Sequence, residues 1–149
     1  MGGRPTLDIV VELNDEYDLK LDPAAVAFAK REAFLKRLSL VTLIDEVAEF
    51  AQSQRGKVPM AIATGSSRMV IEKTLKAVEI SDWFDEVVSA DDVAEGKPAP
   101  DIFLRAAKLL GVDPARCLVL EDAPAGILAA QRAGMQVIAI PSPLASSNC

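Results

Sequence analysis

The sequence predicts an α/β protein whose core is a Rossmann-like parallel sheet with helices on both faces. Short, nearly continuous apolar runs bounded by turn residues read as buried strands. Stretches of about ten residues with helical apolar spacing alternate with these runs. Since the strands of a covered parallel sheet are buried on both faces, they are apolar throughout rather than alternating.

Composition narrows the classes of function. The chain has 149 residues, 50% of them hydrophobic, a net charge of −6 and no histidine. Its length allows one domain with a substantial core, and the acidic balance argues against nucleic-acid binding. Neither a membrane span nor a signal peptide is expected. Without histidine, Ser-His-Asp catalysis and His-ligated zinc are excluded. Cys117 and Cys149 form no CxxC pair and fit a reducing, cytoplasmic compartment.

The first part of the chain is expected to be helical. Pro5 suits the first position of a helix, and Asp22 followed by Pro23 is a typical N-cap and first-turn pair. The second helix should run from residue 24 to about residue 38. An amphipathic helix is expected over 43–54, and Gly56 lies where a helix would end.

Strands and helices alternate in the rest of the chain. The expected strands cover residues 59–63, 86–89, 117–120 and 136–140, and the expected helices cover residues 66–78, 100–110 and 125–133. Gly111 and Gly134 follow two of these helices, as expected for helix ends. Ligands of parallel α/β sheets bind beyond the carboxyl ends of the strands, so the residues after each strand are the candidate site.

A hydroxyl-rich turn, Thr64-Gly65-Ser66, follows the first expected strand and leads into a helix. Free backbone N–H groups at such a turn, together with the helix N-terminus, form a binding site for an anion such as phosphate. The same residues also form an ordinary helix N-cap, so the turn alone leaves both interpretations open.

Two further features follow the second and third strands. Lys97 lies between Gly96 and Pro98 in a stiff turn, and the turn would set the direction of its side chain. The alternative is an ordinary solvated lysine on the surface. Glu121 and Asp122 follow an apolar strand directly, and they either cap a helix or bind Mg²⁺, which prefers one or two carboxylates plus water and phosphate oxygens. The fold would bring hydroxyl, lysine and acids to one edge, as phosphoryl chemistry requires.

Three segments, ATGSSR, DDVAEGKPAPDIFLRAAKLLGV and CLVLEDAPAGILAAQRAGMQVIAI, resemble the haloacid dehalogenase-like hydrolase superfamily, in the branch of β-phosphoglucomutases and sugar-phosphate phosphatases. The resemblance implies a Mg²⁺-dependent phosphatase of small phosphorylated metabolites. It gives Thr64 and Lys97 catalytic roles, with Thr64, Gly65, Ser66 and Lys97 binding phosphate and Glu121 and Asp122 binding the metal. It also implies that residues 1–40 form a partial helical cap, in which Arg4 touches substrate, and that residues 41–149 form the core.

The sequence departs from the family at the nucleophile. The family's D-x-D-G-T motif, whose first Asp becomes the phosphoaspartate, has no counterpart here. In this family that motif ends the central strand, which would lie between the strands ending at Ala63 and Leu120. These two strands should therefore either pair directly or leave two loosely joined halves. We expect a chain truncated at the N-terminus and also before a final strand and helix, dependent on the missing N-terminal segment, inactive alone and marginally stable.

Three alternatives to the phosphatase remain at this point. The chain could be a non-catalytic remnant or interaction module that still binds phosphate or Mg²⁺. A phosphoglucomutase would use the same residues to return the phosphoryl group to a sugar. A phosphorylation-switched receiver domain shares the residue types, but its acids come first and its lysine last, whereas here the order is Thr64, Lys97, Glu121.

Overall fold

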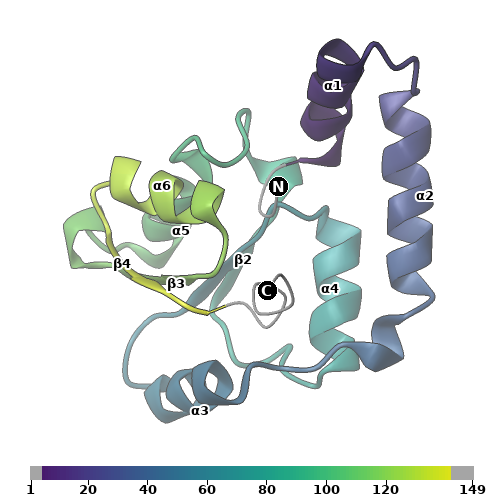
Figure 1. The fold of residues 1–149 in the computed structure, drawn as a ribbon. Helices are drawn as coiled ribbons and strands as arrows, with labels where there is room; N and C mark the ends of the chain where they lie inside the picture. The colour runs from purple at the N-terminus through teal and green to yellow at the C-terminus, as the bar shows by residue number, and fades with distance from the viewer. Residues whose placement is uncertain (1–4, 142–149) are drawn as a thin grey trace.

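A computed structural model describes residues 5–141 of the chain (Figure 1). Its helices are α1 (Thr6–Tyr17), α2 (Pro23–Leu35), α3 (Asp45–Gln54), α4 (Arg68–Ala77), α5 (Asp101–Leu110) and α6 (Pro124–Arg132), with short 3-10 turns η1 (Leu38–Leu40), η2 (Ala90–Asp92) and η3 (Pro114–Arg116). The strands are β1 (Ala61–Ala63), β2 (Glu86–Val88), β3 (Leu118–Glu121) and β4 (Gln136–Ala139). The α/β class, with parallel strands flanked by helices, is confirmed.

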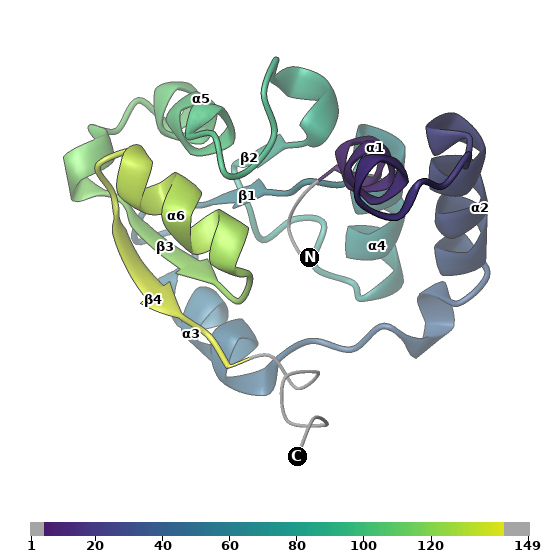
Figure 2. The ribbon, with the colours of Figure 1, turned by 45° about the horizontal axis from the view of Figure 1, so that its top comes forward.

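The strands form two separate parallel pairs rather than one sheet. β1 pairs with β2 in the register Ala61 to Glu86, and β3 pairs with β4 in the register Leu118 to Gln136. Figure 2 shows the two pairs as distinct ribbons. Of the two outcomes expected from the sequence, direct pairing of the strands ending at Ala63 and Leu120 is therefore wrong, because β1 and β3 do not pair.

One hydrophobic core joins the two pairs of strands. Helix α5 packs against β1 and β2, while α6 packs against β3, β4 and α5. The apolar face of α5 is buried whereas Leu104 and Arg105 on its other side are exposed, as helical periodicity requires. Helix α6 contributes the small buried residues Ala129 and Ala130 to this core. The buried core consists of Val88, Ile102, Phe103, Ala106, Ala107, Ala129, Ala130, Ala133 and Met135.

Helices α1 and α2 form an antiparallel hairpin beside the α/β part (Figures 1 and 2). The side chain of Asn14 closes its connection by accepting from the N–H of Leu21 and donating to the carbonyl of Leu21. Asp22 caps α2 through the N–H groups of Ala24 and Ala25, as predicted for this residue. At the start of α1, Pro5 lies so close to Gly96 that a Cβ there would be 2.6 Å from its ring. The start of the α1–α2 hairpin therefore contacts Gly96, the residue before Lys97.

No helix in the part of the chain that the structure describes is long and apolar enough to cross a membrane.

The shared core predicts a large difference between two aliphatic side chains of α5. Ile102 is 1% exposed and Leu104 is 41% exposed. We expect Ile102→Ala to lower the free energy of unfolding by about 2–5 kcal/mol, because it removes buried methyl groups and leaves a cavity. Leu104→Ala, the matched control, should cost less than about 1 kcal/mol. Urea denaturation measures both, and equal losses would contradict this assignment of the core.

Candidate active site

Lys97 lies where the two pairs of strands meet, at their carboxyl ends. Its side chain is buried, and Nζ donates to Glu121 Oε2 at 2.6 Å and to the carbonyl oxygen of Ala63 at 3.3 Å. The ammonium also lies 4.9 Å from the centre of the Phe103 ring. Because Ala63 ends β1 and Glu121 ends β3, one cation contacts both halves of the molecule. The expectation that the turn fixes the direction of Lys97 agrees with this position.

Glu121 is held on both of its carboxylate oxygens. Oε2 accepts from Lys97, and Oε1 accepts from the backbone N–H groups of Asp122, at 3.2 Å, and Ala123, at 3.0 Å. Burial by itself raises the pKa of Glu121, but the hydrogen bond and charge of Lys97 outweigh burial and hold this pKa below the ordinary 4.5. The carboxylate therefore stays ionised and fixed.

Asp122 is more exposed than Glu121, and its pKa is shifted in the opposite direction. Partial burial and the negative charge of Glu121 raise its pKa above the ordinary 3.8. The two carboxylates therefore repel each other at the end of β3. A divalent cation would relieve this repulsion, and two carboxylates with phosphate and water oxygens are a ligand set that Mg²⁺ accepts. Mg²⁺ at these two residues stays a prediction, since no group of three His, Cys, Asp or Glu side chains that could hold a metal ion is found within residues 5–141.

The turn after β1 carries unpaired hydrogen-bonding groups. The N–H of Thr64 bonds to Val88 in β2, and the Thr64 hydroxyl accepts from the N–H of Ser66 at 3.1 Å. Among the described residues, no partner is found for the N–H groups of Gly65 and Ser67. The hydroxyl oxygen of Ser67 is buried and also has no partner. Free donors at a helix N-terminus are suited to an anion, which supports the predicted phosphate turn and adds Ser67 to it.

A second loop holds this turn in place, and the sequence interpretation missed it. Asp92 accepts from Arg68 Nη2 at 2.6 Å and from both the N–H and the hydroxyl of Ser89 at 2.7 Å. Asp91 accepts from the N–H of Arg68 at 2.8 Å and so caps α4. The signal was available, because Ser89-Ala-Asp-Asp92 fits the pattern of a capping box, which the structure forms at η2.

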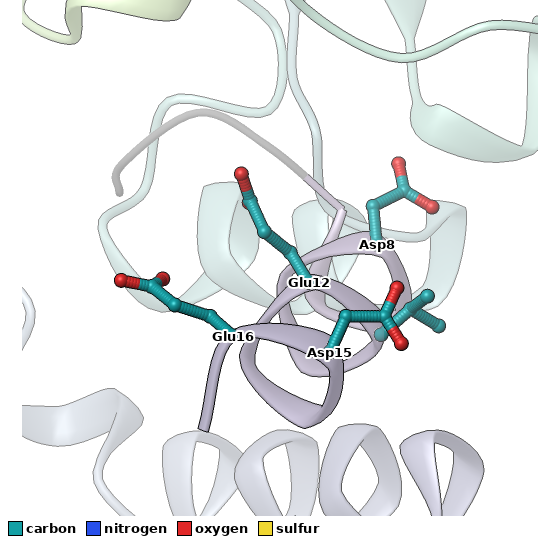
Figure 3. Close-up of a pocket in the computed structure, with 5 residues that line it drawn as sticks. Asp8, Glu12, Asp15 and Glu16 are labelled. Atoms are coloured by element: carbon teal, nitrogen blue, oxygen red, sulfur yellow. The ribbon is translucent and has the colours of Figure 1, made fainter. Parts of the chain in front are cut away.

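The structure thus brings Lys97, Glu121 and the end of β1, next to Thr64, into one place. Asp122 follows Glu121, and Gly65 and Ser66 follow Thr64 in the same turn. Arg4, the predicted substrate contact, lies outside the described residues. A shallow, open pocket lies elsewhere, on the surface of α1, and is lined by Asp8, Val11, Glu12, Asp15 and Glu16 (Figure 3). None of the predicted site residues lines it.

A comparison with known protein families identifies the chain. Residues 4–134 match the haloacid dehalogenase-like hydrolase family. The chain belongs to this family. This membership covers nearly the whole chain and agrees with the resemblance carried by the segments around Thr64, Lys97 and Glu121.

Individual relatives of this haloacid dehalogenase-like chain include phosphatases. It is 41% identical to fructose-1-phosphate phosphatase YqaB of Escherichia coli over 145 residues, which cover 93% of this chain and 73% of that protein. It is 42% identical to validoxylamine A 7'-phosphate phosphatase of Streptomyces hygroscopicus over 84 residues, 56% of this chain and 39% of that protein. The chain therefore spans only part of the length of these relatives.

A solved structure shares the arrangement of both halves. CbbY from Rhodobacter sphaeroides, solved in complex with phosphate, is 28% identical and superposes with a TM-score of 0.81. The match covers 93% of this chain and 66% of that one. Because so much of the chain superposes at once, the two strand pairs keep the same relative placement in a solved protein.

Gly126 tests the placement of Glu121. A Cβ at this position of α6 would overlap the Glu121 carboxyl group. We expect Gly126→Ala to displace Glu121 from Lys97 and to lower the free energy of unfolding by about 1–3 kcal/mol, although alanine favours a helix by about 1 kcal/mol over glycine. The control is Gln131→Ala, an exposed change on the same helix. Denaturant titration decides, and a Gly126→Ala variant more stable than the parent would contradict the packing.

Asp92 should give the chain a defined acid sensitivity. Hydrogen bonds from the backbone and side chain of Ser89, and then from Arg68, lower the pKa of Asp92 from 3.8 to about 2. A carboxyl group whose pKa is lowered by folding stabilises the fold above its unfolded pKa and loses that contribution as pH falls. We expect the parent chain to lose more stability than Asp92→Asn between about pH 4 and pH 2. Urea denaturation midpoints of the parent and of Asp92→Asn, measured across this pH range, check the prediction. An equal loss of stability in both proteins would contradict it.

Proposed function

We propose that the complete protein of which these residues form the site is a Mg²⁺-dependent phosphatase of small phosphorylated metabolites, with sugar phosphates as the substrate class. The main support for this proposal is the position of Lys97. Its buried ammonium contacts the ends of both strand pairs, beside the turn that contains Thr64. The family is one of hydrolases, and the relatives named as phosphatases support the same reaction. A mutase, which returns the phosphoryl group to a sugar, would use the same residues and ranks second.

Each group of the site has a part in this chemistry. The N–H groups of Gly65 and Ser67 and the hydroxyl of Thr64 would hold phosphoryl oxygens, since donors fixed in advance need no reorganisation during the reaction. Lys97 would balance the negative charge of the phosphoryl group and of the attacking carboxylate. Glu121 and Asp122 would hold Mg²⁺, which supplies Lewis-acid stabilisation of the phosphoryl charge.

The attacking group itself is not in this chain. In the proposed reaction an Asp carboxylate attacks phosphorus, the alcohol leaves, and water hydrolyses the aspartyl phosphate. The sequence contains no D-x-D-G-T motif to supply that Asp. We therefore propose that residues 1–149 alone bind phosphate but do not turn over substrate. A non-catalytic binding module is the alternative, and the absent motif is the observation that favours it.

A pair of threonine variants tests the site. Thr64 follows β1, whereas Thr74 bonds its hydroxyl to the carbonyl of Val70 within α4. We expect inorganic phosphate with Mg²⁺ to bind the chain, and Thr64→Val to weaken binding about tenfold, because it removes a hydrogen bond to a charged ligand. The isosteric change Thr74→Val should leave phosphate affinity unchanged. Titration calorimetry measures both.

The same preparation tests the reaction. We expect no release of p-nitrophenol from p-nitrophenyl phosphate by residues 1–149, with or without Mg²⁺. Turnover that Lys97→Ala abolishes would show that the chain has its own nucleophile and contradict the proposed inactivity. Failure of the parent chain to bind phosphate would contradict the proposed site.

A further inference from the structure

The turn that carries Lys97 is bonded to the rest of the protein at few points. Residues 94–99 lie between η2 and α5, outside any helix or strand. Within the turn, the N–H of Ala99 donates to the carbonyl of Gly96 at 3.0 Å. Among the described residues, one hydrogen bond joins the backbone of this turn to another element. Arg132 Nη1, at the end of α6, donates to the carbonyl oxygen of Pro98 at 3.0 Å.

The position of the Lys97 ammonium depends on where the backbone of this turn is held, because a lysine has a flexible four-carbon stem. The ammonium donates to Ala63 at the end of β1 and to Glu121 at the end of β3. It also lies over the ring of Phe103 in α5. Since Lys97 is only 6% exposed, its whole side chain occupies a fixed path through the interior. Movement of the turn would therefore carry the ammonium away from all three groups.

The residues before and after Lys97 are held in different ways. Gly96 lies against Pro5, because a Cβ on Gly96 would be 2.6 Å from the proline ring. This contact prevents the turn from moving closer to the helical hairpin, but a ring carbon cannot draw the turn toward the site. The bond from Arg132 to Pro98 is directional, since the guanidinium presents its donors in a rigid planar fork.

Helix α6 contacts both members of the ion pair or their neighbours. Near its start, Gly126 leaves room for the Glu121 carboxyl group, which a Cβ would overlap. At its end, Arg132 holds the residue that follows Lys97. A cation in the last turn of a helix is also favoured by the helix dipole, and this is the ordinary explanation for Arg132. That explanation assigns Arg132 no effect on Lys97.

We propose that Arg132 is a positioning residue for Lys97. By bonding to the Pro98 carbonyl, it fixes the turn so that the Lys97 ammonium stays at the shared ends of β1 and β3. Arg132 acts through the backbone of the turn. Its effect on the placement of Lys97 is independent of any ligand, whereas its effect on phosphate binding rests on the proposed function.

The placement of Lys97 is measured without ligand, by NMR of the 149-residue chain with ¹³C-labelled lysine and isoleucine. The Phe103 ring should shift the ε-methylene protons of Lys97 upfield, and Lys97→Arg assigns this signal by removing it. We expect Arg132→Ala to move the signal toward those of exposed lysines and to abolish the nuclear Overhauser contact between Lys97 and Phe103. The methyl signals of buried Ile102 show in the same samples whether the core is intact.

Lys108→Ala is the matched control. Lys108 is an exposed cation in the last turn of α5, so its removal costs the same favourable interaction with a helix dipole. We expect this variant to leave the Lys97 signal unchanged. Arg132→Lys keeps a donor and a positive charge at the end of α6, and it should retain most of the parent signal.

Phosphate binding separates this proposal from the proposed function. We expect Arg132→Ala to weaken the binding of inorganic phosphate with Mg²⁺ about tenfold, because a displaced Lys97 loses its hydrogen bond to a charged ligand. An unchanged Lys97 signal in Arg132→Ala would overturn the positioning role. Loss of the Ile102 signals as well would overturn it in favour of a role in folding. A displaced Lys97, in a chain whose parent binds no phosphate, would support the positioning role and contradict only the proposed function.

Discussion

The ion pair of Lys97 and Glu121 is the contact on which the site of this protein depends. A buried ion pair contributes little net stability unless its remaining groups are satisfied, because both charges lose their hydration. Here those groups are satisfied. Glu121 accepts two backbone N–H groups besides the lysine, and Lys97 also donates to Ala63. The pair thereby fixes a cation and a carboxylate at the ends of two strands that do not touch through hydrogen bonds.

The phosphate turn depends on a different set of contacts. The turn is tied to the end of β2 by the backbone bond of Thr64 to Val88. It is tied to the loop after β2 by the backbone bond of Ala90 to Ser66 and by the carboxylates of Asp91 and Asp92, which bind Arg68. Asp91, rather than the turn's own residues, caps α4. The donors of Gly65 and Ser67 therefore stay free for a ligand. Rigid support of this kind is what an anion site needs if its donors are to be placed before the ligand arrives.

Packing of α5 on α6 explains how the two strand pairs stay together without a common ladder. Alanines of both helices lie in one buried cluster with Ile102 and Phe103, and residues of β1 and β3 pack against that cluster. Hydrophobic burial is not directional, so it holds the two halves without pairing their edges. Within residues 5–141, the two strand pairs are therefore joined by packing and not by a shared ladder.

The sequence by itself predicted the class of fold, because apolar runs and helical spacing are local signals. The strand and helix positions agree with the structure to within a few residues at their ends. It also predicted that Lys97 has a fixed direction, because Gly96 and Pro98 constrain the backbone around it. The acidic pair Glu121 and Asp122 was visible because two charges directly follow an apolar run in the sequence.

Only the tertiary structure decided which groups meet. Spacing along the chain does not show that Lys97 selects Glu121 rather than Asp122, since that depends on how α6 places Gly126 against the carboxyl group. Nor does it show that Asp91 and Asp92 serve a turn more than twenty residues earlier. The division into two strand pairs is likewise a tertiary result. Whether the edges of β1 and β3 pair is decided by long-range packing, which leaves no local pattern in the sequence.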